Sequence, residues 1–595
     1  MSLIEELKRR NVFKVAIAYI VMAWLVLQVA DVILNNIAAP GWIFKVLMLF
    51  LAIGLPFAVF FAWAFELTPE GLKREHEVDR TRSITANTGR KLNLLITTVL
   101  VLALGYFAFD KFVLSANRDA ALIEATMQTI SEQTATEKVP AQSDKSIAVL
   151  PFVNMSEDAS NEYFSDGISE ELLNLLAKIP EIRVIGRTSS FQFKDKNEDL
   201  RVIGEMLGVA NILEGSVRKS GNTVRVTAQL INAEDGAHLW SDTYDRNLDD
   251  VFKVQDEIAE AVVSVLKVKL LGEALPKRAT PQLNEAYDLY LKGRYFYTRL
   301  GAEYLVTAQQ FFEQAVEADP ELALAWDGLA AVYIRQILNG ELPPENGMAL
   351  TWNALDRAVE LDPTLSVTHY RIGFIRMIFD WDWPSANTAF KKALAIDPNF
   401  PDALSGAGLL RILLGQKKEA IDYAQRGLRA DPLRSSSYHN IGFINYQAGD
   451  YPVASAGFRN ALELSDGSYT RGNFYLSLVL LAQGKLDEAL AECRKETGEQ
   501  WRLAGLSVIN HAMGRNTESH AALEEMSEKF GDKAAYIIAS AHAFRGEIEA
   551  AFEWLDRAYA QHDPLLAWMK LDPLLKNLEG DPRLDAMLQK MNLDG

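Results

Sequence analysis

The chain has 595 residues, 49% of them apolar and 23% charged, with a formal net charge of −19 at pH 7. A chain of this length is too long to fold around one hydrophobic core, so about three or four domains are expected. The acidic balance argues against a nucleic-acid-binding body, and the single cysteine excludes an internal disulfide and a disulfide-framed secreted module. We interpret that cysteine, Cys493, as a small core side chain on a helix.

Three apolar stretches near the N-terminus are each long enough to cross a bilayer, which takes about 20 apolar residues. They cover residues 12–34, 42–67 and 92–114. The first stretch is too long for a removable signal peptide, and no small-residue cleavage site follows it. The sequence therefore predicts a transmembrane domain of three helices over residues 1–114.

Lysines and arginines flank these stretches unevenly. They gather before residue 15 and in the 68–91 loop, whereas the NNIAAPG loop between the first two stretches has none. Positively charged loops stay in the cytoplasm, so the N-terminus and the 68–91 loop are expected there. Residues 115–595 are then expected in the periplasm, outside a bacterial inner membrane. Asp31 lies near the outer end of the first stretch, where it is expected to be hydrated; the alternative is a functional ionisable residue within the span. Residues 115–145 have the composition of a polar linker.

A strand, a polar loop and an amphipathic helix follow in the segment IAVLPFVNMSEDASNEYFSDGISEELLNLLAKI (147–179). Many nucleotide-binding domains begin in this way, but a phosphate cradle needs clustered glycines. This loop offers only Gly167 among several acidic residues, so we interpret the segment as structural. Ser165 or Ser169 is expected to cap the helix. The helix is expected to bury one apolar stripe, formed by Leu172, Leu173, Leu176 and Ile179.

The α/β pattern continues after this helix. The sequence predicts a strand over 182–193, a short helix over 199–209, a hairpin that turns at 220–222, and a closing helix over 248–270. Apolar and polar residues alternate in the second strand of the hairpin, so one face of the sheet is expected to be buried. The apolar residues of that strand are Val224, Val226, Ala228 and Leu230. Together these elements predict an α/β domain over 146–272.

Two segments of this domain carry a family resemblance, IAVLPFVNMS…EYFSDGISEELLNLLAKIPEIRVIGRTSSFQFK and LGVANILEGSVRKSGNTVRVTAQLINAEDGAHLWSDTYDR. Over nearly all of 145–270 the sequence resembles the TolB amino-terminal-like domain. In some bacterial regulators and adenylate cyclases this domain accompanies arrays of tetratricopeptide (TPR) repeats in the periplasmic portion of the protein. The segments LKRRNVFKVAIAYIVMAWLVLQVADVI and FAWAFELTPEGLKREHEV resemble the membrane segment of such inner-membrane TPR proteins. In those relatives a winged helix or a cyclase precedes the membrane. Only about 11 residues stand there in this sequence, so the output domain is expected to be lacking.

From about residue 285 the sequence is helical and periodic. The segments AVEADP, AVELDP, ALAIDP and GLRADP end at residues 320, 363, 398 and 432, at intervals of 43, 35 and 34. A 34-residue period with small residues ahead of a proline is the signature of tetratricopeptide (TPR) repeats. The sequence predicts an all-α TPR superhelix over 283–595, with about seven or eight repeats and a C-terminal cap.

Stacked TPR repeats present the first helix of each repeat on a concave surface. The positions expected to line it are Tyr370, Phe374, Met377, Asp402, Ser405, Leu409, Ile412, Ser436, His439, Phe443 and Tyr446. Exposed apolar surface usually marks a contact site, so one hypothesis is a groove that binds a peptide or a partner helix. The alternative is that the groove is filled by the chain's own C-terminal helices or by a second copy.

The sequence offers no motif for catalysis or metal binding. The eight histidines are scattered without HExxH spacing, one cysteine cannot build a zinc site, and GxSxG, GKS and GxGxxG are absent. Acidic pairs such as Glu170–Glu171 are interpreted as helix-start residues, where the helix dipole favours them. No catalytic residue, cofactor or metal is therefore expected.

The combined prediction is a membrane α-helical fold with three spans, plus an α/β domain and an all-α TPR solenoid. The expected function is a non-enzymatic, membrane-anchored scaffold or adaptor that binds protein partners in the periplasm, in envelope assembly or signalling. Contact with the lipid bilayer is expected, contact with nucleic acid is not, and assembly into a homo-oligomer stays open. The alternative function is a transmembrane sensor that relays a periplasmic signal to a separate cytoplasmic partner.

Overall fold

The computed structural model describes residues 145–179, 181–247, 251–266, 285–299 and 301–593, together with short stretches and single residues between 16 and 74. The chain divides into two units, Met1–Ala125 and Thr126–Gly595. In the first unit, strands β1 (Phe65–Thr68) and β2 (Gly71–Arg74) form an antiparallel pair in which Phe65 faces Arg74 and Thr68 faces Gly71.

The predicted membrane-spanning fold class and the predicted inner-membrane location are not supported. In the part of the chain that the structure describes, no helix combines the length and the apolar character needed to cross a bilayer. The end of the predicted span 42–67 is a strand, because β1 begins at Phe65. Most of the three expected spans, and all of 115–144, lie outside the described residues.

The second unit opens with a mixed sheet of strand order β5-β3-β6-β7-β8, in which β4 also pairs with β6. The strands are β3 (Ser146–Val149), β4 (Val153–Asn154), β5 (Arg183–Val184), β6 (Asn211–Ser220), β7 (Thr223–Asn232) and β8 (His238–Asn247). β3 runs parallel to β5 and β6, whereas β6, β7 and β8 are antiparallel. The predicted hairpin is confirmed, since β6 and β7 are joined by a two-residue turn in which Gly221 has a φ of +55°.

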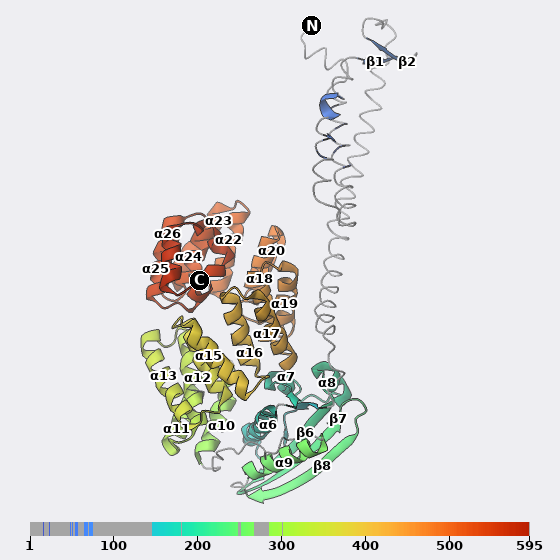
Figure 1. Cartoon of the computed structure of the whole chain (residues 1–595), viewed down its shortest axis with the longest axis vertical. Helices are drawn as coiled ribbons and strands as arrows, with labels where there is room; N and C mark the ends of the chain where they lie inside the picture. Colours follow the sequence, from blue (N-terminus) through green and yellow to red (C-terminus); the bar gives the residue numbers. More distant parts are fainter. Residues whose placement is uncertain are drawn as a thin grey trace. The chain divides into compact units, whose positions relative to one another are not determined.

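Helices cover both faces of this sheet (Figure 1). They are α6 (Glu162–Ala177), which follows the short helix η3 (Ala159–Asn161), α7 (Arg187–Phe191), α8 (Leu200–Leu207) and α9 (Val251–Val265). Ile147 and Val149 of β3 join a core that contains α6 and α9, whereas Ala148 of β3 and Leu150, directly after the strand, join a second core with α8. Alternate residues of one strand therefore serve opposite layers.

Two predictions of local structure were wrong in this region. The helix α6 begins at Glu162, before both serines that were expected to cap it, although its predicted apolar stripe is buried. The expected strand over 182–193 is strand only at Arg183–Val184 and then becomes the helix α7.

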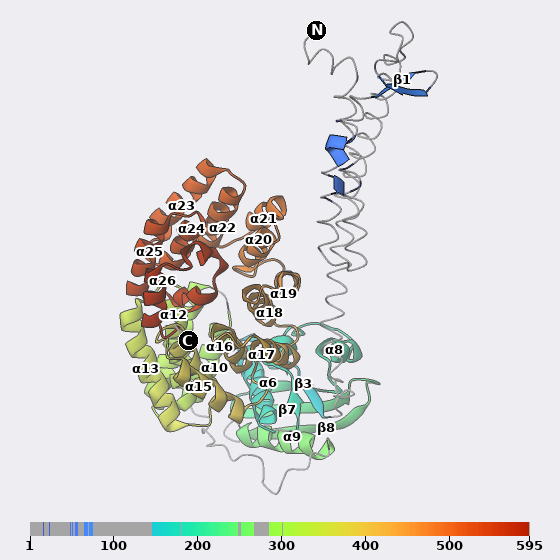
Figure 2. The same ribbon diagram turned by 45° about the horizontal axis from the view of Figure 1, so that its top comes forward.

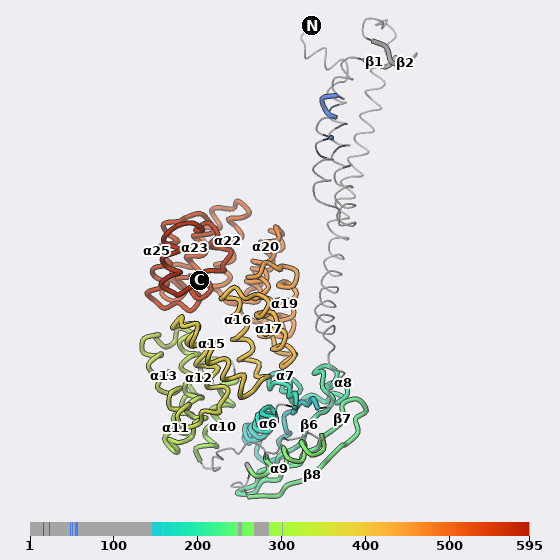
Figure 3. The backbone as a smooth tube through the Cα atoms, in the orientation of Figure 1, coloured from blue at the N-terminus to red at the C-terminus, as the bar shows by residue number. Residues whose placement is uncertain are grey.

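From Glu285 onward, the described helices form eight successive pairs. Figure 3 shows the course of the backbone through them. The pairs are α10 (Glu285–Tyr297) with α11 (Ala302–Ala318), α12 (Ala323–Leu338) with α13 (Pro344–Leu361), α14 (Ser366–Ile378) with α15 (Trp383–Ile396), α16 (Pro401–Leu413) with α17 (Lys417–Ala430), α18 (Ser435–Gln447) with α19 (Tyr451–Glu463), α20 (Gly472–Ala482) with α21 (Leu486–Cys493), α22 (Glu499–Ala512) with α23 (Asn516–Phe530), and α24 (Ala535–Phe544) with α25 (Ile548–Ala560). The prediction of a TPR array is confirmed.

Small residues explain why the helices pack so closely. The ring of Phe390 on α15 lies against Gly373 of α14 and Gly406 of α16, where an added Cβ would meet the ring at 2.7 and 2.5 Å. A larger residue at either glycine would force the helices apart.

The last described segment returns to the solenoid's interior. It consists of η5 (Pro564–Leu571), η6 (Pro573–Leu578) and α26 (Pro582–Lys590), and η5 packs on α14 and α16. The end of the chain also reaches α15, because Trp383 Nε1 donates to the carbonyl oxygens of Met591 and Asn592, both at 3.0 Å. The solenoid therefore closes on itself, with its last helices beside its early repeats (Figure 2).

Candidate functional site

The residues expected to line the concave groove lie on α14, α16 and α18, the first helices of three consecutive repeats. The buried ones are Met377, Ile412, His439, Phe443 and Tyr446, and the partly exposed ones are Tyr370, Phe374, Asp402, Ser405, Leu409 and Ser436. Two of the partly exposed residues, Phe374 and Leu409, pack against the cluster that contains Leu566 and Leu578 of the C-terminal segment, so much of the predicted groove is closed.

The closed part is covered by the chain's own C-terminal segment. The ring of Trp568 in η5 meets that of Phe443 edge to face, with 4.8 Å between ring centroids, and Trp568 also packs in the cluster that contains Ile412. Leu566 and Leu578 of the same segment are fully buried. Burying one such side chain contributes about 1.5–3 kcal/mol, so removing the whole segment from the groove would cost many kcal/mol.

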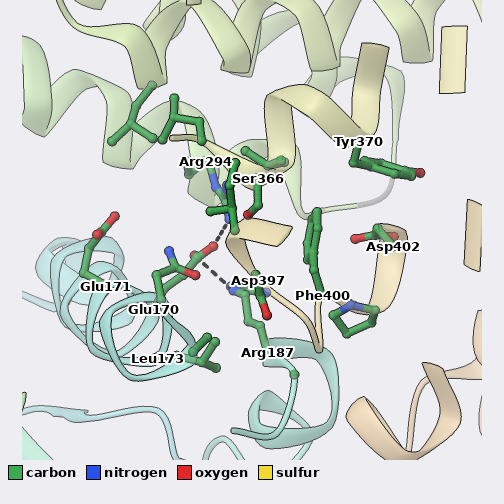
Figure 4. Close-up of a pocket in the computed structure, with 18 of the residues that line it drawn as sticks. Glu170, Glu171, Leu173, Arg187, Arg294, Ser366, Tyr370, Asp397, Phe400 and Asp402 are labelled. Carbon is green, nitrogen blue, oxygen red and sulfur yellow. Dashed lines mark hydrogen bonds and ion pairs between the residues drawn. The ribbon is translucent and has the colours of Figure 1, made fainter. Parts of the chain in front are cut away.

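A separate cavity of about 1470 Å³ lies between the α/β domain and the first repeats. One wall is formed by α6 and α7, and the other by α10, α12, α14 and the turns that precede α16 and α18. Figure 4 labels Glu170 and Arg187 of the first wall, and Arg294 and Tyr370 of the second. We call this space the interdomain cavity. Of the residues expected in the groove, it includes Tyr370 and Asp402.

A shared carboxylate lies at the centre of the interdomain cavity. Glu170 of α6 accepts from Arg187 Nε at 3.1 Å through Oε2, and its Oε1 pairs with the guanidinium of Arg294 on α10. All three side chains are partly exposed to the cavity (Figure 4). Arg294 Nε is buried and has no hydrogen-bond partner among the described residues. Two guanidinium groups therefore share one carboxylate.

An aromatic corner lies on the solenoid side of the same cavity. The ring of Tyr370 packs edge to face on that of Phe400, with 5.8 Å between centroids, and burial raises the pKa of the Tyr370 phenol. Arg434 pairs with Asp402 beside them. The cavity thus combines an aromatic contact surface with paired charges, a combination suited to polar and apolar side chains of one ligand.

Aspartate–proline pairs at the ends of the second helices also line the cavity, at Asp319, Asp362, Asp397 and Asp431. Three of these carboxylates accept from the backbone N–H two residues further on, in Glu321 (3.0 Å), Thr364 (2.9 Å) and Asn399 (3.0 Å). This is the Asx turn expected of aspartate at such a position. We call these segments the Asp-Pro turns.

The fourth Asp-Pro turn holds the α/β domain instead. Asp431 accepts from the backbone N–H of Ser189 at 2.8 Å and from its hydroxyl. Leu433 N–H, the usual donor in such a turn, donates to Ser189 Oγ at 2.8 Å. Gly186 N–H adds a bond to the Ala430 carbonyl at 2.8 Å. Ser189 is therefore inserted into the turn, and it fixes α7 to the solenoid.

In the sequence, the Asp-Pro pairs of these turns indicated only where each repeat ends. The sequence prediction also missed the cavity residues of the α/β domain, Glu170 and Arg187, because their partners lie on other elements. A signal that could have found the wall of the cavity is the recurrence of Asp-Pro at the same repeat position.

Comparison with known proteins places the repeats in a family. Residues 382–435 and 445–502 match the family described as "Tetratricopeptide repeat". The chain is 38% identical over 232 residues to "Putative adenylate cyclase 3" of Rhizobium meliloti (strain 1021), covering 38% of this chain and 39% of that protein. It is 25% identical over 179 residues to "Anaphase-promoting complex subunit 3" of Schizosaccharomyces pombe, covering 30% of this chain and 25% of that protein. The chain thus spans about two fifths and one quarter of these relatives.

Two solved structures illustrate the likeness of fold. The type IV pilus biogenesis factor PilW aligns at a TM-score of 0.28 and 16% identity, covering 42% of this chain and 95% of PilW. The human IFIT1 dimer with PPP-AAAA aligns at 0.37 and 15% identity, covering 53% of this chain and 86% of that one. At these scores no functional conclusion is drawn from either structure. The chain carries tetratricopeptide repeats, which are protein-interaction repeats with extended concave binding surfaces.

Proposed function

We propose that the chain is a non-enzymatic scaffold or adaptor that binds a polypeptide segment of a partner protein in the interdomain cavity. The observation that carries this proposal is the contrast between the predicted groove and the interdomain cavity. The apolar groove is filled by the chain's own residues 564–578, whereas the cavity that faces the α/β domain is open. An open concave surface is where TPR proteins bind their partners.

The size of the cavity favours a polypeptide over a small molecule. Sites for small ligands measure about 300–1,000 Å³, and this cavity has a volume of about 1470 Å³. A segment of chain fills such a space with several side chains, which can use both the charged centre at Glu170 and the aromatic corner at Tyr370 and Phe400.

The composition of the lining supports the rest of the proposal. The central charges of the described lining are held in ion pairs, which supports a binding role. Acidic side chains outnumber basic ones in this lining, which supports a protein partner in preference to nucleic acid.

The test is affinity purification of the tagged chain from its own cells, with partners quantified by mass spectrometry. The cavity variant replaces both Tyr370 and Phe400 by alanine, and Phe400→Ala alone serves as the milder change. The matched control replaces two surface residues on second helices, Val306 and Leu350, which are 49% and 45% exposed. We expect the cavity variants to lose a partner that the control retains. Recovery of the same proteins in the same ratios by all variants would contradict the proposal.

A further inference from the structure

The Asp397 turn is the repeat equivalent of the Asp431 turn, one repeat earlier in the solenoid. Both turns follow a second helix, both begin with Asp-Pro, and both line the interdomain cavity. The Asp431 turn is occupied by α7, whereas the Asp397 turn faces the cavity on the side where Figure 4 shows Arg187 and Phe400.

Two of the four Asp-Pro turns, at Asp431 and Asp362, receive a hydroxyl in addition to a backbone N–H, and the turns at Asp319 and Asp397 each receive the backbone N–H of the residue two positions on. Asp431 receives an N–H and a hydroxyl from Ser189, and Asp362 receives an N–H and a hydroxyl from its own Thr364, at 2.9 and 2.7 Å. The residue at the corresponding place after Asp397 is Asn399, which gives its backbone N–H only. Among the described residues no hydroxyl reaches Asp397.

Asp397 is therefore a carboxylate with unused acceptor capacity in the wall of a cavity. An ionised carboxylate offers about four acceptor sites, and a partly buried one is stabilised by each further donor. Burial raises the pKa of Asp397 to about 6, against the opposing effects of the Asn399 N–H and the nearby charge of Lys178. Raised pKa values of this kind are common in carboxylates at functional sites.

We propose that the Asp397 turn is a second docking point, which receives the N-terminal turn of a helix from the partner polypeptide in the way the Asp431 turn receives α7. This inference rests on the proposed function and names the chemistry of its ligand. The ligand gives Asp397 one backbone N–H and one serine or threonine hydroxyl.

The contact with α7 also specifies what precedes that hydroxyl. A Cβ added to Gly186 would lie 2.7 Å from Asp431 Cγ, so only glycine allows the backbone to approach the carboxylate. Gly186 stands three residues before Ser189, at the start of α7. The expected ligand is therefore a Gly-x-x-Ser or Gly-x-x-Thr segment at the start of a helix.

The chain itself supplies the probe for this site. A fluorescent peptide with the sequence of residues 183–195, RVIGRTSSFQFKD, is titrated with the full-length protein, and binding is followed by anisotropy. We expect saturable binding that Asp397→Ala weakens by about tenfold or more, which is the effect of losing a hydrogen bond to a charged group. Asp362→Ala is the matched control and should leave the affinity unchanged, because Thr364 already occupies that carboxylate.

Two further measurements keep the result interpretable. Asp397→Asn retains an acceptor for the Asn399 N–H, so it should fold like the wild type and still bind the peptide more weakly. A peptide with alanine in place of the serine equivalent to Ser189 should lose about tenfold in affinity, and one with valine in place of the glycine should lose more.

Equal binding to wild type and to both Asp397 variants would overturn the inference, and so would the absence of saturable binding up to about 1 mM. These failures are distinguishable from failure of the proposed function. If the natural partner is still lost on replacing Tyr370 and Phe400 while Asp397 variants retain it, the cavity binds a polypeptide of another chemistry.

Discussion

At the scale of single residues, Asp563 is a buried carboxylate that starts the C-terminal segment. It is 5% exposed and accepts from the N–H groups of Tyr536 and Leu565, both at 3.0 Å. Burial raises its pKa to about 6. This folded-state pKa is above the unfolded value of about 3.9. Asp563 therefore makes its full contribution to stability at pH values below the unfolded-state pKa. This contribution is lost as the pH rises through the folded-state pKa.

The first prediction concerns the dependence of stability on pH. Asp563→Asn cannot titrate, so the variant should lose less thermal stability than the wild type between about pH 5 and pH 7.5. The control is Asp581→Asn, which also removes a helix-capping carboxylate, but one whose pKa is lowered by hydrogen bonds from Arg583. Thermal unfolding at both pH values measures the difference. An Asp563→Asn variant with the wild-type dependence on pH would show that this carboxylate is not the titrating group.

Glu170 shows which residue-level properties the sequence could not predict. It was interpreted as a helix-start residue, but α6 begins at Glu162 and Glu170 lies in its middle. Its partners Arg187 and Arg294 come from other elements. The buried positions of the same helix were predicted correctly, since Leu172 and Leu176 depend only on the local helical period.

At the scale of elements, α7 shows how tertiary contacts override local propensity. The segment 182–193 is rich in β-branched and aromatic residues, which favour strands. In the structure, only Arg183–Val184 is strand, and Ser189 is bound at the Asp431 turn in a helical conformation. The sequence holds no local signal for a partner more than 240 residues away.

The second prediction tests the bond that fixes α7 to the solenoid. Ser189→Ala removes the hydroxyl that joins Asp431 to Leu433 N–H, and leaves a buried carboxylate with one donor fewer. We expect a loss of about 1–3 kcal/mol in stability, measured by denaturant unfolding and by faster proteolysis between the α/β domain and the solenoid.

Ser190→Ala is the matched control, because Ser190 Oγ is equally buried and has no hydrogen-bond partner among the described residues. Its removal should cost little or slightly stabilise the protein. Equal losses in the two variants would mean that the bond between Ser189 and Asp431 does not hold the domain.

The helices of the solenoid were predictable, but what fills it was not. The 34-residue period located the repeats because it depends on packing between neighbouring helices. The contact of Trp568 with Phe443 joins distant parts of the chain, and an apolar concave lining has the same composition whether a partner or the chain's own end covers it. The sequence therefore left both occupants open.

At the scale of the whole molecule, three apolar stretches near the N-terminus predicted three membrane spans. Among the residues that the structure describes, no helix has the length and apolar character needed to cross a bilayer, and most of the three stretches lie outside those residues. The α/β and TPR parts follow the predicted order along the chain, but the cavity between them depends on their packing, of which the sequence shows only the recurring Asp-Pro pairs.

The central claim is that this cavity holds a segment of a partner protein, and site-specific photo-crosslinking tests it most directly. Phe400, in the aromatic corner, is replaced by p-benzoylphenylalanine in cells that normally make the protein, and Leu350, exposed on α13, is replaced in the control. The account predicts that light attaches a defined partner protein at position 400 and not at position 350, and that peptide mapping finds one contiguous segment of that partner. Crosslinks from position 400 only to the chain itself would contradict the account.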